Sequence, residues 1–209
     1  MDNKPLTMAL PKGRLLKQVQ RFFSEKGIEI DTTDDRKLVI GDKDNSLRIF
    51  LVKNSDLPTY ISHGIAGLGI CGEDVLGESS ANLLKLAAMP FGSTRMCLAG
   101  KKEANENDIY SRRLSIATKF PHFTRNYYHK MGISVEIIKL NGSVELAPVL
   151  GLTPYIVDLV ETGSTLKANN LKVLKELAKI NVYLVANPAY YKINYDRVEK
   201  LLSKLDIKE

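Results

Sequence analysis

Apolar residues along the chain follow two alternating patterns. Short aliphatic runs of five or six residues are typical of buried strands, and apolar positions three and four residues apart are typical of helices. Leu6 to Leu10 and Leu47 to Val52 are runs of the first kind. The segment 15–26 is of the second kind, and its apolar face consists of Leu15, Leu16, Val19, Phe22 and Phe23. Because such segments alternate along the chain, the pattern predicts an α/β fold.

The same patterns continue to the end of the chain. We expect further strands at 38–40, 83–87, 94–99, 114–118, 135–140 and 155–160, and helices at 121–131, 143–150 and 190–205. The run 171–186 is ambiguous, because Leu171, Leu174 and Leu177 have helical spacing whereas Val182 and Leu184 alternate as in a strand. We favour strands there, partly on the resemblance described below.

Gly67 to Gly72 matches the dinucleotide-binding pattern G-x-G-x-x-G letter by letter. That motif requires a strand directly before its first glycine. Here the end of a helix precedes Gly67, and the strand residues Leu68, Ile70 and Cys71 lie inside the motif. We therefore do not predict a dinucleotide site.

The segment Asp158 to Leu166 combines carboxylates with small hydroxyl residues at the end of a predicted strand. Glu161-Thr162-Gly163-Ser164-Thr165 links that strand to the start of a helix, where free backbone N–H groups and the helix dipole attract anions. A phosphate alone does not require acids, but a sugar phosphate gives Asp158 and Glu161 hydroxyl groups to accept from. On these residues alone, an ordinary helix cap with a surface acid is an equally good interpretation.

A basic turn, Pro11-Lys12-Gly13-Arg14, joins the first strand to the first helix. Ligands of open α/β sheets bind at this edge, although the spacing alone favours a plain basic turn. Arg36 follows the acidic turn 31–35, where it can simply balance Asp34 and Asp35.

Composition narrows the range of functions. The 209 residues are 44% hydrophobic and carry a net charge of +6, which suits polyanionic ligands such as nucleotides. The basic residues are scattered and form no nucleic-acid-binding motif, so no nucleic-acid partner is expected. Cys71 and Cys97 lie in apolar runs and are predicted to be buried thiols. No apolar segment reaches the roughly 18 residues of a membrane span, and the N-terminus does not resemble a signal peptide, which favours a cytoplasmic protein.

Two separated motifs resemble one known family. The segment 145–166 and the segment Ala-Leu-Pro-Lys-Gly-Arg-Leu at 9–15 are similar to the signatures of the catalytic subunit of ATP phosphoribosyltransferases, which open histidine biosynthesis. The resemblance covers nearly the whole chain. It implies an α/β fold of two lobes, similar to type II periplasmic binding proteins, with the active site in the cleft between the lobes. The first lobe would comprise residues 1–92 and 181–209, and the second, with the phosphoribosyl-binding loop, residues 93–180.

The resemblance also implies a reaction. N1 of ATP attacks C1 of phosphoribosyl pyrophosphate, giving N1-(5-phosphoribosyl)-ATP and pyrophosphate, with Mg²⁺ shielding the pyrophosphate. The segment from Asp158 through Glu161, Thr162, Gly163, Ser164, Thr165 and Leu166 would bind phosphoribosyl pyrophosphate. Lys12, Arg14 and Arg36 would act on the pyrophosphate or the ATP phosphates, and Asp74 and Glu145 would lie near the nucleotide. For Asp74, capping of the following helix is an equally weighted alternative. No residue is predicted to ligate a metal directly.

The chain ends at Glu209, which resembles the short form of this family. Short forms work with a separate regulatory subunit related to histidyl-tRNA synthetase, so we expect a homodimer within a hetero-oligomer. Two other classes stay open from the residues: a solute-binding module without catalysis, and a phosphoribosyltransferase acting on a free base. The separation of Asp158 from Glu161 and the Pro-Lys-Gly-Arg turn count against the latter.

Overall fold

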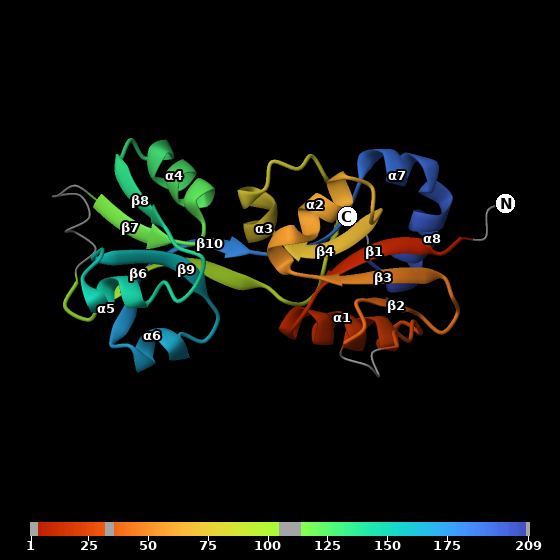
Figure 1. Cartoon of the computed structure of the whole chain (residues 1–209), viewed down its shortest axis with the longest axis horizontal. Helices are drawn as coiled ribbons and strands as arrows, with labels where there is room; N and C mark the ends of the chain where they lie inside the picture. The colour runs from red at the N-terminus through yellow and green to blue at the C-terminus, as the bar shows by residue number, and fades with distance from the viewer. Residues whose placement is uncertain (1–3, 32–35, 105–113, 208–209) are drawn as a thin grey trace. The chain divides into compact units, whose positions relative to one another are not determined.

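The computed structural model describes residues 4–31, 36–104 and 114–207. The chain forms two compact units, one of Met1–Gly92 with Asn181–Glu209 and the other of Ser93–Ile180. Each unit contains a mixed β-sheet with helices on both faces (Figure 1). The predicted α/β fold is confirmed.

The first unit is built on a sheet with the strand order β2-β3-β1-β4-β11-β5. Its strands are β1 (Leu6–Pro11), β2 (Val39–Gly41), β3 (Leu47–Val52), β4 (Leu68–Gly72), β5 (Leu84–Ala88) and β11 (Val182–Ala186). Its helices are α1 (Arg14–Glu25), α2 (Leu57–Ser62), α3 (Glu73–Glu78), α7 (Pro188–Ile193) and α8 (Tyr195–Leu205), with a 3₁₀ turn at Asn54–Asp56. Strands β3 and β4 run parallel to β1 on either side of it. The carboxyl ends of these three strands therefore meet at one edge.

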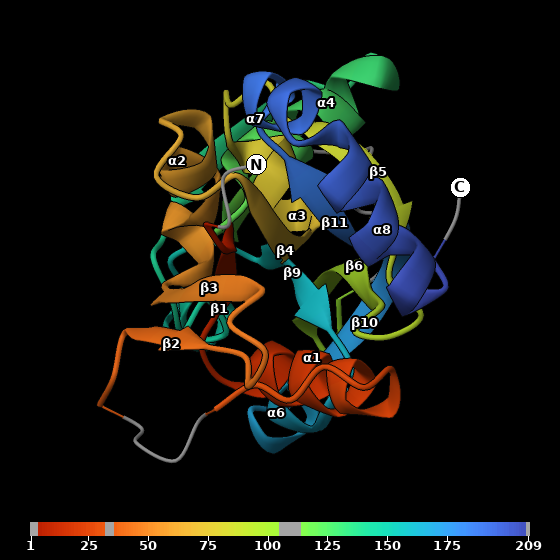
Figure 2. The same ribbon diagram turned by 90° about the vertical axis from the view of Figure 1, so that its right-hand side faces the viewer.

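Alternation along β1 divides the core of this unit between the two faces of the sheet. Met8 and Leu10 pack in the cluster that takes Val19 and Phe23 from α1 and Val198 from α8. Ala9, between them, belongs to the opposite cluster with Leu57 and Ile61 of α2. Helices α1 and α8, which cover the first face, can be followed in Figure 2.

The second unit has a sheet with the order β10-β6-β9-β7-β8. Its strands are β6 (Thr94–Lys101), β7 (Leu114–Thr118), β8 (Val135–Lys139), β9 (Tyr155–Val160) and β10 (Leu171–Ile180), and its helices are α4 (Pro121–Lys130), α5 (Leu146–Leu150) and α6 (Ser164–Ala168). Helix α4 packs against one face through Tyr128, and α5 and α6 pack against the other through Ala147 and Leu166. The ambiguous run 171–186 forms strands β10 and β11, so the preference for strands is confirmed.

The glycine-rich segment 67–72 leads into and forms β4, as expected, and its glycines have a packing role. A Cβ at Gly67 would lie 2.1 Å from the ring of Tyr190, and one at Gly69 would lie 2.4 Å from Cδ1 of Ile61. These positions allow α7 and α2 to approach the sheet closely. Both cysteines are free and buried, as predicted.

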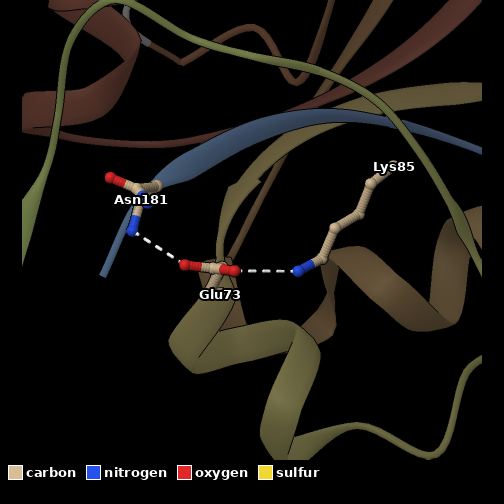
Figure 3. A network of polar contacts seen from close by, with 3 residues as sticks. All are labelled: Glu73, Lys85 and Asn181. Carbon is tan, nitrogen blue, oxygen red and sulfur yellow. Dashed lines mark hydrogen bonds and ion pairs between the residues drawn. The ribbon is translucent and has the colours of Figure 1, made fainter. Parts of the chain in front are cut away.

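Glu73 ties the start of α3 to the start of β11 (Figure 3). Its backbone N–H donates to the carbonyl of Asn181 (2.9 Å), and its Oε2 accepts from the Asn181 backbone N–H (3.1 Å). Its Oε1 pairs with Lys85 Nζ at 2.8 Å. The carboxylate is thus fully engaged inside the first unit.

Two predicted helices differ from the observed ones. The segment 190–205 is two helices, because Asn194 leaves the helical conformation (φ −108°, ψ 23°) and its Nδ2 bonds to the carbonyl of Tyr190. Helix α7 therefore ends at Ile193, and α8 begins at Tyr195. Near 143–150, α5 begins only at Leu146, so Glu145 precedes the helix instead of lying in its first turn. Asp74 lies within the first turn of α3 and is not its N-cap residue, which is Gly72.

Candidate active site

The candidate site lies where three parallel strands of the second unit end. Strand β7 runs parallel to both β8 and β9, with Thr118 opposite Val157. The Thr118 hydroxyl donates to the carbonyl of Val157 (2.6 Å) and accepts from the Phe120 backbone N–H (2.9 Å), which fixes both strand ends. This edge presents the segments that follow each strand, and ligands of α/β sheets bind at such edges.

The loop Glu161–Thr165 follows β9 and offers several polar groups to the same volume. Gly163 has φ of 76°, a left-handed conformation that turns the chain into α6. The Thr162 and Ser164 hydroxyl oxygens are 3.0 Å apart, and the Ser164 backbone N–H donates to Thr162 Oγ1 (3.3 Å). The side chains of Thr162, Ser164 and Thr165 are exposed and can reorient their hydroxyls toward a ligand.

A cavity of about 260 Å³ opens over this loop. It is lined by Glu145, by the end of β9 from Asp158 to Val160, and by the loop through Leu166. The structure thus brings together every residue that the sequence assigned to the phosphoribosyl loop, and adds Glu145 to them. Because hydroxyls, backbone N–H groups and carboxylates share this cavity, it can accept both a phosphate and neighbouring sugar hydroxyls.

Asp158 is the titratable group that this environment changes most clearly. Burial raises the pKa of its carboxyl to about 6, although the Leu159 backbone N–H, 2.8 Å from Oδ1, favours the ionised form. The Glu145 carboxylate raises the pKa further, and the Lys119 ammonium lowers it. Near neutral pH Asp158 is ionised and can accept hydrogen bonds from hydroxyl groups.

Lys119 is a charged neighbour of Asp158 that the sequence patterns did not single out. It follows β7 directly, one residue beyond the last register pair, Thr118 with Val157, and its charge acts on the Asp158 carboxyl. Its side chain is exposed. The signal was present in the sequence, because a lysine right after a predicted parallel strand belongs at the ligand-binding edge.

The helix that follows the loop is short. The expected helix after the loop, α6, has only five residues, Ser164–Ala168. A single turn of helix has a small dipole, so the donors that the loop offers to an anion are its individual N–H and hydroxyl groups. Leu166 contributes only through its backbone, because its side chain is buried in the core against Val160 and Leu171.

The predicted cations belong to the first unit. Lys12 follows β1 next to the end of β3, and its backbone N–H donates to the carbonyl of Val52 (3.1 Å). The antiparallel register of β2, in which the Leu51 N–H donates to the carbonyl of Leu38, brings Arg36 to the same edge. Arg14 begins α1. The structure therefore gathers Lys12, Arg14 and Arg36 around the carboxyl edge of the first sheet.

Asp74 lies at this edge as well, after β4, but its side chain is only 8% exposed. Its assignment to the nucleotide stays a prediction. Among the described residues, no group of three or more His, Cys, Asp or Glu side chains could hold a metal ion. Within the same part of the chain, no helix is both long and apolar enough to cross a bilayer.

Comparison with solved structures first defines the class of protein. The alkanesulfonate-binding protein SsuA from Xanthomonas axonopodis pv. citri superposes with a TM-score of 0.62 at 14% identity, covering 97% of this chain and 72% of that one. At this identity the likeness concerns the fold alone. The chain is an α/β protein of two lobes, similar to type II periplasmic binding proteins, with a cavity over the loop that follows β9.

Closer relatives define the family. The family model of HisG, ATP phosphoribosyltransferase, matches residues 53–207. The ATP phosphoribosyltransferase of Thermoanaerobacter sp. (strain X514) is 42% identical over 207 residues, covering 98% of this chain and 95% of that protein. The chain also superposes on the ATP phosphoribosyl transferase (HisG:HisZ) complex from Thermotoga maritima, with a TM-score of 0.81, 40% identity and 96% of each chain covered. The chain belongs to the ATP phosphoribosyltransferase family.

Proposed function

We propose that the protein transfers the phosphoribosyl group of phosphoribosyl pyrophosphate to N1 of ATP, the first step of histidine biosynthesis. The bond between C1 of the ribose and the pyrophosphate oxygen breaks, and a bond from C1 to N1 of adenine forms. Membership of the family supports this reaction. The observation that carries it is the cavity in which Asp158 and the loop Glu161–Thr165 meet.

The loop is assigned to the 5-phosphate and the carboxylates to the ribose. Backbone N–H groups and the hydroxyls of Thr162, Ser164 and Thr165 donate to phosphate oxygens. Asp158 and Glu161 accept from ribose hydroxyls, which requires ionised carboxylates. Asp158 meets this requirement above about pH 6. Because N1 of adenine already carries a lone pair, the site needs no protein base and acts chiefly by positioning.

Lys12, Arg14 and Arg36 are assigned to the ATP phosphates or to the departing pyrophosphate. Charge accumulates on the leaving group as the bond to C1 breaks, and fixed cations stabilise it. Their gathering at one edge of the first sheet supports a common ligand. Asp74 and Glu145 are assigned to the nucleotide side of the reaction.

Mg²⁺ is proposed as an ion that the substrate carries. The donor set fits this use, because the cavity offers carboxylate oxygens but the described residues form no dedicated metal cage. Mg²⁺ keeps several waters and commonly joins substrate phosphates to one or two carboxylates. Bound in this way, it would shield charge on the pyrophosphate.

The proposed assembly is a homodimer within a hetero-oligomer that also contains a histidyl-tRNA-synthetase-like regulatory subunit, in the cytoplasm. The Thermotoga maritima relative forms a complex of HisG with HisZ. Exposed apolar side chains on and after α5, Leu146, Val149, Leu150 and Leu152, support an apolar contact between two copies.

The function is tested by incubating the protein with ATP, phosphoribosyl pyrophosphate and Mg²⁺ and identifying the products by mass spectrometry. We expect phosphoribosyl-ATP and pyrophosphate. Free adenine and orotate, each in place of ATP, serve as controls and should give no nucleotide product. A product from either base, or none from ATP with the regulatory subunit present, would reject the proposal.

A further inference from the structure

A second polar surface lies in the first unit, away from the edge that carries Lys12. It is a groove of about 820 Å³ between the α7–α8 junction and the start of β1, hereafter the α7–α8 groove. Lys4, Arg48, Lys192, Arg197 and Lys200 line it, with Asp196 as the opposing charge. Five cations against one carboxylate give this surface a strong positive potential.

The groove lies at the opposite end of the parallel strands from the predicted catalytic cations. Thr7 and Arg48, which are paired in the register of β1 and β3, line the groove near the amino ends of their strands. Lys12 follows the carboxyl end of β1, whose six residues span about 20 Å. A ligand in the groove therefore leaves the catalytic edge uncovered.

The groove is also apolar at its rim, which distinguishes it from a simple phosphate site. Ile193 is 82% exposed and Tyr195 is 52% exposed, and both line the groove. Exposed large apolar side chains beside charged ones are typical of protein interfaces. A small inorganic anion would use the cations and gain nothing from these two side chains.

The walls of the groove are held in place before any partner binds. Arg197 donates to Asn194 Oδ1 (3.2 Å) and to the carbonyl of Lys4, joining the α7–α8 junction to the start of the chain. The Tyr190 hydroxyl accepts from the Thr7 backbone N–H (2.9 Å) and anchors α7 to β1. A rigid surface loses little entropy on binding, which favours a specific partner.

From this combination of charge, exposed apolar groups and rigidity, we propose that the α7–α8 groove docks an acidic surface of the regulatory subunit. The inference rests on the proposed function for the identity of the partner. A second copy of this chain fits poorly, because a twofold contact would place the same cations against one another. The uncharged segment 146–155 at α5 is the better surface for self-association.

The experiment measures binding of the full chain to the histidyl-tRNA-synthetase-like subunit of the same organism by sedimentation velocity and interferometry. We expect Lys192→Glu combined with Lys200→Glu to weaken binding by roughly 100-fold, and Ile193→Ser by about tenfold. Lys43→Glu with Lys172→Glu is the matched charge control, because both lysines are exposed and lie outside the groove. Ile65→Ser is the matched apolar control, because Ile65 is 57% exposed and lies outside both the groove and the α5 surface. Both controls should keep the affinity for the regulatory subunit within about twofold.

Several outcomes would overturn the proposal. They are wild-type affinity in the groove variants, no binding of the subunit by the wild-type chain, or a loss of self-association instead of subunit binding. If tripolyphosphate bound the chain and only that binding was lost in the Lys192 and Lys200 variant, the groove would be a small-anion site. Product formation, followed separately by mass spectrometry, shows whether the proposed reaction stands independently of docking.

Discussion

The two sheets end in edges of the same geometry but of opposite chemistry. In the first unit, the carboxyl edge of β1 and its neighbours carries Lys12, Arg14 and Arg36. In the second, the carboxyl edge of β9 and β7 carries hydroxyls and the carboxylates of Asp158 and Glu161. The fold thus forms the same type of sheet edge in both units. The residues that follow the strands determine which ligand each edge can bind. One edge suits a polyanion and the other a sugar phosphate.

Carboxylates occur at both edges, and their surroundings differ. Glu73, directly after β4, is engaged by Lys85 and by the backbone of Asn181, so its charge serves the structure of its own unit. Asp158, near the end of β9, faces the cavity, and burial together with Glu145 raises the pKa of its carboxyl. A carboxylate that is costly to ionise in the free protein is stabilised most when a ligand supplies hydrogen-bond donors to it.

The largest effect is expected from removing a cation of the first edge. Arg14→Ala should lower kcat by roughly 100-fold, because a fixed cation stabilises charge that develops only as pyrophosphate leaves. KM should rise much less, since the ground-state anions keep the other cations. Steady-state kinetics with ATP and phosphoribosyl pyrophosphate measures both constants.

Lys17→Ala is the control for this comparison, because Lys17 is exposed on the same helix one turn further on. Its kinetic constants should match those of the wild type. Unchanged turnover in the Arg14 variant would show that Arg14 does not stabilise the transition state. The proposed catalytic role of the first edge would then lose its support.

A smaller effect is expected at Asp158, and it depends on pH. The folded pKa of about 6 exceeds the ordinary value of 3.8, so the folded state binds the proton more tightly than the unfolded state. The penalty for ionised Asp158 is therefore absent below about pH 4, develops between pH 4 and 6, and is complete above. Asp158→Asn should raise the free energy of unfolding above pH 7 by about 2 kcal/mol and by little at pH 4.

Urea unfolding at a series of pH values measures this difference. Asparagine keeps an oxygen that can accept from the Leu159 N–H, which makes it the appropriate replacement. The same variant should bind phosphoribosyl pyrophosphate more weakly at pH 8, because it lacks the carboxylate that we propose accepts from ribose hydroxyls. A stability difference that does not change with pH would mean that the pKa of Asp158 is not raised in the folded protein.

Most strands and helices could be predicted from the sequence, because the spacing of apolar residues that marks each of them is a local property of the chain. The strand 155–160 and the loop after it were predicted from apolar spacing, small residues and Gly163, and the structure forms both. The break at Asn194 was missed because it depends on one asparagine that bonds to Tyr190 within a continuous apolar pattern. Periodicity does not distinguish such a break from an uninterrupted helix.

The site residues that follow a single strand, β9, could be predicted from the sequence. Lys119 and Glu145 reach Asp158 from other segments, and only the pairing of β7 with β9 and the fold of 140–146 bring them there. Sheet order is not encoded in local spacing. The raised pKa of Asp158 is for the same reason a property of the folded unit that no motif contains.

The sharpest comparison inside the second unit is between two glycines with the same backbone conformation. Gly163 has φ of 76° in the loop, and Gly151 has φ of 78° at the end of α5, and neither would bring a Cβ into close contact. Gly163→Ala and Gly151→Ala should therefore destabilise the protein by a similar amount, about 1 kcal/mol, through left-handed strain alone.

Their effects on the substrate should differ. Calorimetric titration is expected to show phosphoribosyl pyrophosphate bound about tenfold more weakly by Gly163→Ala, because strain at this residue displaces the loop N–H groups that we propose bind the phosphate. Gly151→Ala should bind it as the wild type does, since Gly151 does not line the cavity. Equal affinity in all three proteins would show that the phosphate is held elsewhere, and the loop would then be no more than the turn that starts α6.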